Sequence, residues 1–477
     1  MLNEDRFFDA DAAVRRIARE IYAETRGLPI VSPHGHVDPA ILATDKAFPD
    51  AATLFVIPDH YVLRTLYSHG VSLDSLGVPP LGGAAYETDP RRIWRTFAEH
   101  VHLFRATPTG VWLDHELYEL FGIRERLGGD TAPRIYDAVA EKLASPEFRP
   151  RALFERFNIE VLATTDAAGD SLEHHQAISE SGLRGRVIPT FRPDALLRIA
   201  SADWPNELRG LERAAGREIT TCEAFVQALA DRRAYFARMG ATATDHGVLT
   251  PRTGSLEPDD AERVFQCARS GDATAEDQER FGAHLLMEMA RLSTEDGLVM
   301  QLHAGSLRDH NRLVFERFGR DRGGDIPVAT EFTRHLRPLL NEFGNDARFR
   351  LIVFTLDESS YSRELAPLAG HYPAMFLGAP WWFHDSIEGM RRFREQTTET
   401  AGIWKTAGFS DDTRAFCSIP ARHDLSRRVD ANWLAGLVAR HVIDMSDARD
   451  MASALAYELA RRAYRVDGYR TGGAHTR

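Results

Sequence analysis

Two histidines separated by one residue, His34 and His36, are the first feature of the sequence whose type and spacing suit chemistry. They end an apolar segment, and residues i and i+2 of a β-strand point to the same face. Two imidazoles on one face at a strand end are good ligands for a divalent metal, with Zn the first expectation and Mn or Fe as alternatives. Because such a tripeptide also occurs by chance, its position in the fold must decide whether it binds a metal.

A carboxylate that could complete this metal set follows a much later apolar run, which ends in Asp411-Asp412. If the first and last strands are neighbours in a closed barrel, Asp412 can reach a metal held by His34 and His36. We choose Asp412 over Asp411. His303, near the end of another run, is either a third imidazole or a substrate contact, and the plainer alternative is a buried, hydrogen-bonded histidine.

Three arginines, Arg192, Arg308 and Arg414, stand just after predicted strands. Arginine binds carboxylates through a planar fork of donors, so the set predicts an anionic substrate. For any one of them, solvation at the surface is the simpler explanation.

An imidazole and a phenol suited to proton transfer occur together in Asp59-His60-Tyr61. With Asp412, His60 and Tyr61 are the candidate catalytic residues. Asp59 is also a good N-cap, so this segment could simply begin a helix. Trp382 could form the flat wall of a sugar site, although core packing is expected for at least one ring of Trp381-Trp382.

Eight short apolar or β-branched runs position these residues. The runs end at His36, Asp166, Phe191, Gly247, Gly305, Asp357, Trp382 and Asp412. Most are continuously apolar, which is typical of strands buried on both faces of a parallel sheet, and segments with helical spacing lie between them.

Eight alternating strands and helices predict an α/β fold of the TIM-like (β/α)8 barrel class, whose catalytic side chains lie at the carboxyl ends of the strands. A doubly wound open sheet is the alternative. The first two runs are about 120 residues apart, so we predict a large helical insertion after strand 1, at about 40–150, within a single domain of residues 1–477. A flexible tail is expected at about 467–477.

Composition excludes several classes of protein. The formal net charge is −12 and no basic patch stands out, so no nucleic-acid partner is expected. Three cysteines without CxxC spacing favour a reduced, cytoplasmic protein. The N-terminus lacks the pattern of a signal peptide, and no apolar run is long enough to span a membrane.

The chain resembles the uronate isomerases (glucuronate isomerases), a branch of the amidohydrolase superfamily. The resemblance lies in the order of its segments: LPIVSPHGHVDP, DHYVLRTLYSHG, FRATPTGVWLDHELYELFGI, ATTDAAGDSLEHH, VIPTFRPD, ATDHG, MQLHAGSLRDHN, GAPWWFHD, and DDTRAF followed by ARHDLSRR. The chain departs from the family at Gly35, where cysteine is common, and at Asp411, Pro380 and His384.

The resemblance implies interconversion of D-glucuronate with D-fructuronate and of D-galacturonate with D-tagaturonate. It also implies one divalent metal on His34, His36 and Asp412, and a homo-oligomer, with a trimer as the first expectation. Binding roles would fall on His60, Tyr61, Arg192, His303, Trp382 and Arg414. The main rival is a metal-dependent hydrolase of the same superfamily, and a non-catalytic sugar-acid binder is a third reading. The arginine set and the lack of a clear strand-4 lysine favour the isomerase.

Overall fold

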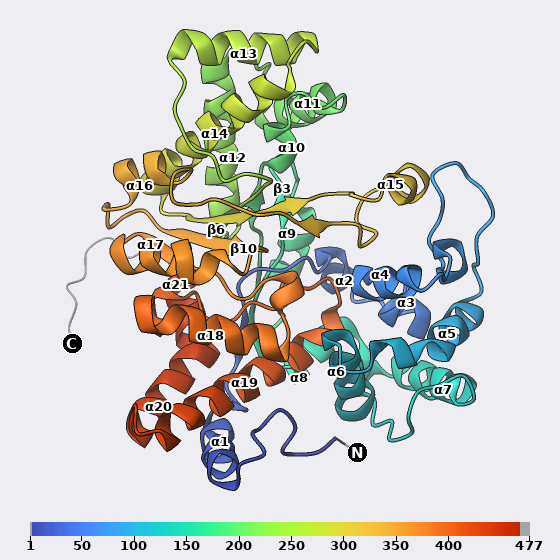
Figure 1. Ribbon diagram of the computed structural model, residues 1–477. Helices are drawn as coiled ribbons and strands as arrows, with labels where there is room; N and C mark the ends of the chain where they lie inside the picture. The colour runs from blue at the N-terminus through green and yellow to red at the C-terminus, as the bar shows by residue number, and fades with distance from the viewer. Residues whose placement is uncertain (1, 468–477) are drawn as a thin grey trace.

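Parallel strands form the centre of the molecule, and each pairs with its neighbour in chain order (Figure 1). The computed structural model describes residues 2–467. Two strands are interrupted, so that β3 continues the line of β2, and β5 that of β4. The parallel strands are β1 (Ile30–Ser32), β2 (Ile159–Ala163), β3 (Asp166–Ala167), β4 (Arg186–Ile188), β5 (Phe191–Arg192), β6 (Ala243–Val248), β7 (Val299–Ala304), β10 (Leu351–Thr355) and β11 (Met375–Leu377).

The last predicted run closes the ring between β11 and β1. Thr406 forms a parallel bridge with Leu377. On the other side, Ser410 Oγ donates to the carbonyl oxygen of His34 at 3.0 Å, and the His36 amide donates to the carbonyl oxygen of Thr413 at 2.9 Å. The (β/α)8 prediction is therefore confirmed. The doubly wound alternative is wrong, because the strand order follows the chain and never reverses at a switch point.

The strands are buried on both faces, as their apolar runs predict. Inward-facing residues from six strands form one cluster in the barrel: Val31, Val161, Ile188, Ala243, Val299 and Ile352. Their neighbours Met300, Leu302, Leu351 and Val353 belong to a different cluster, which packs against the surrounding helices. This alternation fills the barrel interior with side chains and leaves the carboxyl ends of the strands as the place for a site.

The chain between β1 and β2 is helical and has its own apolar cluster, which includes Phe55, Trp94, Phe97 and Ile135. In Figure 1 most of these helices (blue to teal) gather to one side of the strands. The helices are α2 (Pro39–Thr44), α3 (Ala51–Phe55), α4 (His60–Ser68), α5 (Pro90–Glu99), α6 (Pro108–His115), α7 (Ala132–Leu143) and α8 (Pro150–Arg156). That they form an insertion at about 40–150 within a single domain of residues 1–477 stays a prediction.

The other helices surround the barrel, and α11 to α14 extend beyond it at the top of Figure 1. They are α1 (Ala12–Thr25), α9 (Glu173–Glu180), α10 (Asp194–Leu197), α11 (Trp204–Ala215), α12 (Cys222–Arg238), α13 (Pro258–Ser270), α14 (Ala275–Asp296), α15 (Arg312–Phe318), α16 (Arg337–Phe343), α17 (Ala366–His371), α18 (Ile387–Ala401), α19 (Ile419–Ala439), α20 (Met445–Ser453) and α21 (Leu459–Ala463).

A small antiparallel pair, β8 (Ser306–Leu307) with β9 (Ile326–Pro327), follows β7. Within residues 2–467, no helix has the length and apolar character to cross a bilayer. The predicted tail at about 467–477 lies outside the described residues, except for Asp467.

Candidate active site

A cavity of about 870 Å³ brings together the side chains that the sequence singled out. Residues from strand ends and from α4, far apart in the chain, contribute to its wall. Nine of the predicted site residues line it: His36, His60, Tyr61, Arg192, His303, Arg308, Trp382, Asp412 and Arg414. His34, the tenth, is buried directly beside them.

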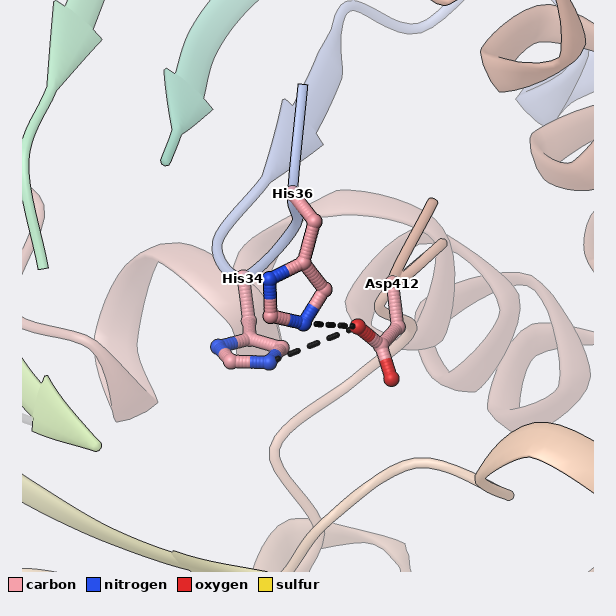
Figure 2. Close-up of side chains that lie close together, drawn as sticks. All are labelled: His34, His36 and Asp412. Atoms are coloured by element: carbon pink, nitrogen blue, oxygen red, sulfur yellow. Dashed lines mark ion pairs between the residues drawn. The ribbon is translucent and has the colours of Figure 1, made fainter. Parts of the chain in front are cut away.

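The two histidines of the first run converge on one carboxylate oxygen (Figure 2). Asp412 Oδ1 lies 3.1 Å from His36 Nε2 and 3.4 Å from His34 Nε2. Donor atoms bound at about 2.0–2.2 Å to a common tetrahedral ion lie about 3.3 Å apart. Among the described residues, Oδ1 of Asp412 is buried without a hydrogen-bond partner. The three side chains therefore fit a divalent metal ion by both spacing and chemistry.

Two of these three residues, Asp412 and His36, have the protonation state of a metal ligand. Burial would raise the pKa of Asp412, but His34 and His36 outweigh it and hold that pKa well below its usual range. Burial lowers the pKa of His36, so its imidazole is neutral at neutral pH. Burial would lower the pKa of His34 as well, but the carboxylates of Asp245 and Asp412 outweigh it and raise that pKa. An ionised carboxylate and a neutral imidazole are the protonation states that a metal requires of its ligands.

The choice of Asp412 over Asp411 agrees with the way the two side chains point. Asp412 has φ 41°, in the left-handed region that few non-glycine residues adopt. Asp411 is fully buried on the other side of this turn, where Oδ2 lies 3.0 Å from His423 Nε2. The left-handed turn thus sends the two adjacent carboxylates in different directions, and only Asp412 reaches the cavity.

His303 stacks on His34 with ring centroids 4.6 Å apart, and its Nδ1 donates to Asp245 Oδ1 at 2.6 Å. His303 is therefore a buried, hydrogen-bonded histidine, as the plainer alternative predicted. It also lines the cavity, and its contact with a metal or a substrate stays a prediction. Asp245 was not singled out from the sequence. Its place at the end of the run that closes at Gly247, where polar residues face the site, was the available signal.

Each predicted arginine has a carboxylate partner. Arg192 Nε lies 2.7 Å from Asp194 and 3.5 Å from Asp245, and Arg308 lies 2.6 Å from Asp325. Among the described residues, Arg414 has one carboxylate partner, with Nη2 3.2 Å from Asp321 Oδ1, and its side chain is 36% exposed. Arg308 is more exposed, at 43%, but its ion pair is shorter, so the carboxylate contact of Arg414 is the one that an anion can most readily replace. The acidic partners Asp321 and Asp325 were missed, because they lie in a loop without a motif.

An aromatic wall faces the metal ligands. His60 stacks on Tyr61 with centroids 4.6 Å apart and meets Trp382 edge-on at 5.0 Å. Trp381 is buried against His303, whereas Trp382 stays partly exposed, so core packing applies to one ring of the pair. Asp59 caps α4 by accepting from the Tyr61 and Val62 amides, as its simpler reading predicted. That cap fixes the start of the helix that presents His60 and Tyr61.

Burial shifts the protonation of this pair. It lowers the pKa of His60 to about 3, aided by Arg414, so His60 is a neutral imidazole. Burial also raises the pKa of Tyr61, so the phenol keeps its proton. The cavity thus holds a phenol that can donate, a neutral imidazole, and an ionised carboxylate that can accept.

Comparison with known proteins relates nearly the whole chain to one family. The family model for glucuronate isomerase matches residues 4–464. A uronate isomerase of Nostoc punctiforme is 55% identical over 98% of this chain and 99% of its own length. The crystal structure of glucuronate isomerase from Caulobacter crescentus superimposes with a TM-score of 0.96 at 50% identity, covering 98% of each chain. That of uronate isomerase from Thermotoga maritima has a TM-score of 0.91 at 27% identity, covering 97% of this chain and 99% of its own.

Proposed function

The chain belongs to the glucuronate isomerase family, and from that premise we propose that its cavity isomerises hexuronates between aldose and ketose forms. The substrates are D-glucuronate, giving D-fructuronate, and D-galacturonate, giving D-tagaturonate. The observation that carries this proposal is the convergence of Arg414, the metal set around Asp412, and the phenol of Tyr61 on one cavity. These are groups for binding a carboxylate, stabilising an oxyanion and moving a proton.

The substrate carboxylate binds to Arg414. Its guanidinium offers several N–H donors in a planar fork, and within residues 2–467 the ion pair with Asp321 engages one of them. Arg192 is held by two carboxylates and is better placed to brace Asp245 and the histidines than to bind substrate. Arg308 and Trp382 flank the sugar, because both line the cavity, with the guanidinium carbon of Arg308 5.8 Å from the centre of the Trp382 ring.

Isomerisation moves a proton from C2 to C1 through an enediol, and the proton next to the carbonyl is only weakly acidic in solution. The chemistry that a divalent ion supplies when held by His34, His36 and Asp412 is stabilisation of negative charge developing on oxygen. We assign zinc first, with manganese or iron as alternatives, because imidazole and carboxylate ligands suit all three.

The chain's own groups handle the proton. Oδ1 of Asp412 faces the two imidazoles, and Oδ2 accepts the C2 proton and returns it to C1 on the same face. The Tyr61 phenol donates a hydrogen bond to the substrate oxygen that gains charge. His60 stacks on Tyr61 and, being neutral, can relay the hydroxyl proton between O2 and O1.

The rival reading, a metal-dependent hydrolase, would use the same ligands to activate water. Family membership over nearly the whole chain favours the isomerase. The experiment is incubation of metal-loaded protein with D-glucuronate in D₂O, with loss of the aldehyde signal and growth of the ketose followed by NMR. A Tyr61→Phe variant should lose at least about tenfold in kcat. A wild-type protein that leaves D-glucuronate unchanged but hydrolyses amides or esters would overturn the proposal.

The predicted homo-oligomer, with a trimer as the first expectation, is part of the same proposal. Light scattering of the purified protein tests it, and a monomer would contradict it.

A further inference from the structure

Arg422 and His423 lie in the segment ARHDLSRR near the start of α19, and the proposed chemistry gives them no role. Both side chains are almost fully buried, with 2% and 4% of their surface exposed. Burial of an arginine and a histidine is unfavourable unless their donors are satisfied. Their partners are therefore informative, and both residues bind Asp411, the residue before the predicted metal ligand Asp412.

Arg422 joins three segments that carry predicted site residues. Its Nη1 donates to the carbonyl oxygen of Asp411 at 3.1 Å and to Asp385 Oδ2 at 2.6 Å. Asp385 ends the Trp381–Asp385 loop, which bears Trp382. The guanidinium carbon lies 3.5 Å from the centre of the Trp112 ring and 5.5 Å from that of Tyr61. One side chain thus contacts the turn of the metal ligand, the loop of the sugar wall and the predicted proton donor.

His423 fixes the same turn through a side chain. Its Nε2 lies 3.0 Å from Oδ2 of Asp411, and its ring packs edge-on against Phe409. Asp411 is consequently held twice, at its main-chain carbonyl by Arg422 and at its carboxylate by His423.

Asp411, which these contacts hold, precedes Asp412, whose backbone is strained. Asp412 has φ 41°, and left-handed backbone at a non-glycine residue persists only where the surroundings over-determine it. On its other side, the carbonyl oxygen of Thr413 accepts from the His36 amide at 2.9 Å. With both neighbours fixed, the backbone of Asp412 is held in the conformation from which its carboxylate lies toward His34 and His36.

We propose that Arg422 and His423 are positioning residues that hold Asp411 so that Asp412 faces the two histidines, and that Arg422 also seats Tyr61. They touch neither substrate nor metal. The link to turnover rests on the proposed isomerase function, whereas the link to metal binding does not.

The test compares Arg422→Lys and His423→Gln with a matched control, Arg394→Lys. Arg394 is equally buried and binds Asp430 of the same helix α19 through both carboxylate oxygens, at 2.7 and 3.0 Å. It contacts none of the site segments named above. Each chelated protein is titrated with zinc against a chromophoric competitor, its melting temperature is recorded, and kcat and KM for D-glucuronate are measured after zinc loading.

Arg422→Lys and His423→Gln should each lose about 10- to 100-fold in zinc affinity and in kcat, the range found for groups that orient metal ligands. In His423→Gln, KM should stay within about twofold, because Arg414 and the Arg422–Asp385 pair are untouched. Arg394→Lys should lower the melting temperature and leave zinc affinity and kcat at wild-type values. If Arg422→Lys does not fold, His423→Gln carries the test, because it leaves the Arg422–Asp385 pair intact.

Wild-type zinc affinity in both site variants would overturn the proposal, and so would equal losses in Arg394→Lys, since a general brace of the fold would produce them. If the wild type isomerises no uronate while both site variants still lose zinc affinity, the positioning role stands and the proposed function fails.

Discussion

Arg414 and Asp321 form an ion pair at the wall of the cavity, with Nη2 3.2 Å from Oδ1. Asp321 comes from the loop between α15 and β9, and its side chain is 51% exposed. A carboxylate of the protein thus occupies the arginine to which we assign the carboxylate of the substrate. Substrate binding must therefore share or displace this contact. Substitutions in the pair should for this reason change substrate binding directly.

Replacing Arg414 tests the assigned carboxylate site. Arg414→Met should lower kcat/KM for D-glucuronate by about 10- to 100-fold, because a hydrogen bond to a charged group contributes about 1.5–3 kcal/mol. Steady-state kinetics on metal-loaded protein measure kcat/KM. Arg312→Met, at an exposed residue of α15 paired with Glu316, is the control and should change nothing. Unchanged kinetics in Arg414→Met would remove Arg414 from the site.

Replacing Asp321 should have the opposite effect on binding. Asp321→Asn removes the charge that competes for Arg414, so KM for D-glucuronate should fall by about two- to fivefold while kcat stays within about twofold. The same kinetic assay at fixed ionic strength measures both constants. A higher KM would mean that Asp321 orients Arg414 for the substrate instead of competing with it.

Asp166, on β3, predicts how stability depends on pH. Burial raises its pKa to about 7, against a hydrogen bond from Thr164, whereas an unfolded aspartate titrates near about 3.9. Between about pH 4 and pH 7 the folded protein keeps a proton that the unfolded chain releases. The free energy of unfolding therefore falls as the pH rises through this window.

An Asp166→Asn variant should lose this dependence. Between pH 4.5 and pH 8, its melting temperature should fall less than that of the wild type. The corresponding difference in the pH-dependent free energy of unfolding is up to about 4 kcal/mol. Differential scanning calorimetry at both pH values measures it, and Asp272→Asn at an exposed position serves as control. Parallel pH profiles for wild type and Asp166→Asn would show that Asp166 titrates normally in the fold.

Much of the fold could be predicted because the barrel strands are continuously apolar and end in polar residues. That regularity predicts His34 and His36 beside Asp412, since the first and last strands of a closed barrel are neighbours. The helical character of α4 and the cap at Asp59 follow from local sequence in the same way.

What escaped prediction depends on side chains that arrive from elsewhere in the fold. Asp411 and Asp412 are identical in type, and the contacts that hold Asp411 away from the cavity come from Arg422 and His423 on α19. Asp321 pairs with Arg414 across a large separation in the sequence, from a loop without periodicity. No local pattern encodes such contacts, because they arise from tertiary packing.

The most direct test of the central claim is a paired assay of D-glucuronate and D-galacturonate on chelated and on metal-restored protein. The account predicts conversion of both sugar acids to their 2-keto isomers by the restored protein, loss of turnover on chelation, and loss of metal recovery in a His36→Ala variant. Full turnover by protein shown by elemental analysis to be metal-free would contradict the role assigned to His34, His36 and Asp412. No conversion of either uronate by the metal-loaded protein would contradict the function itself.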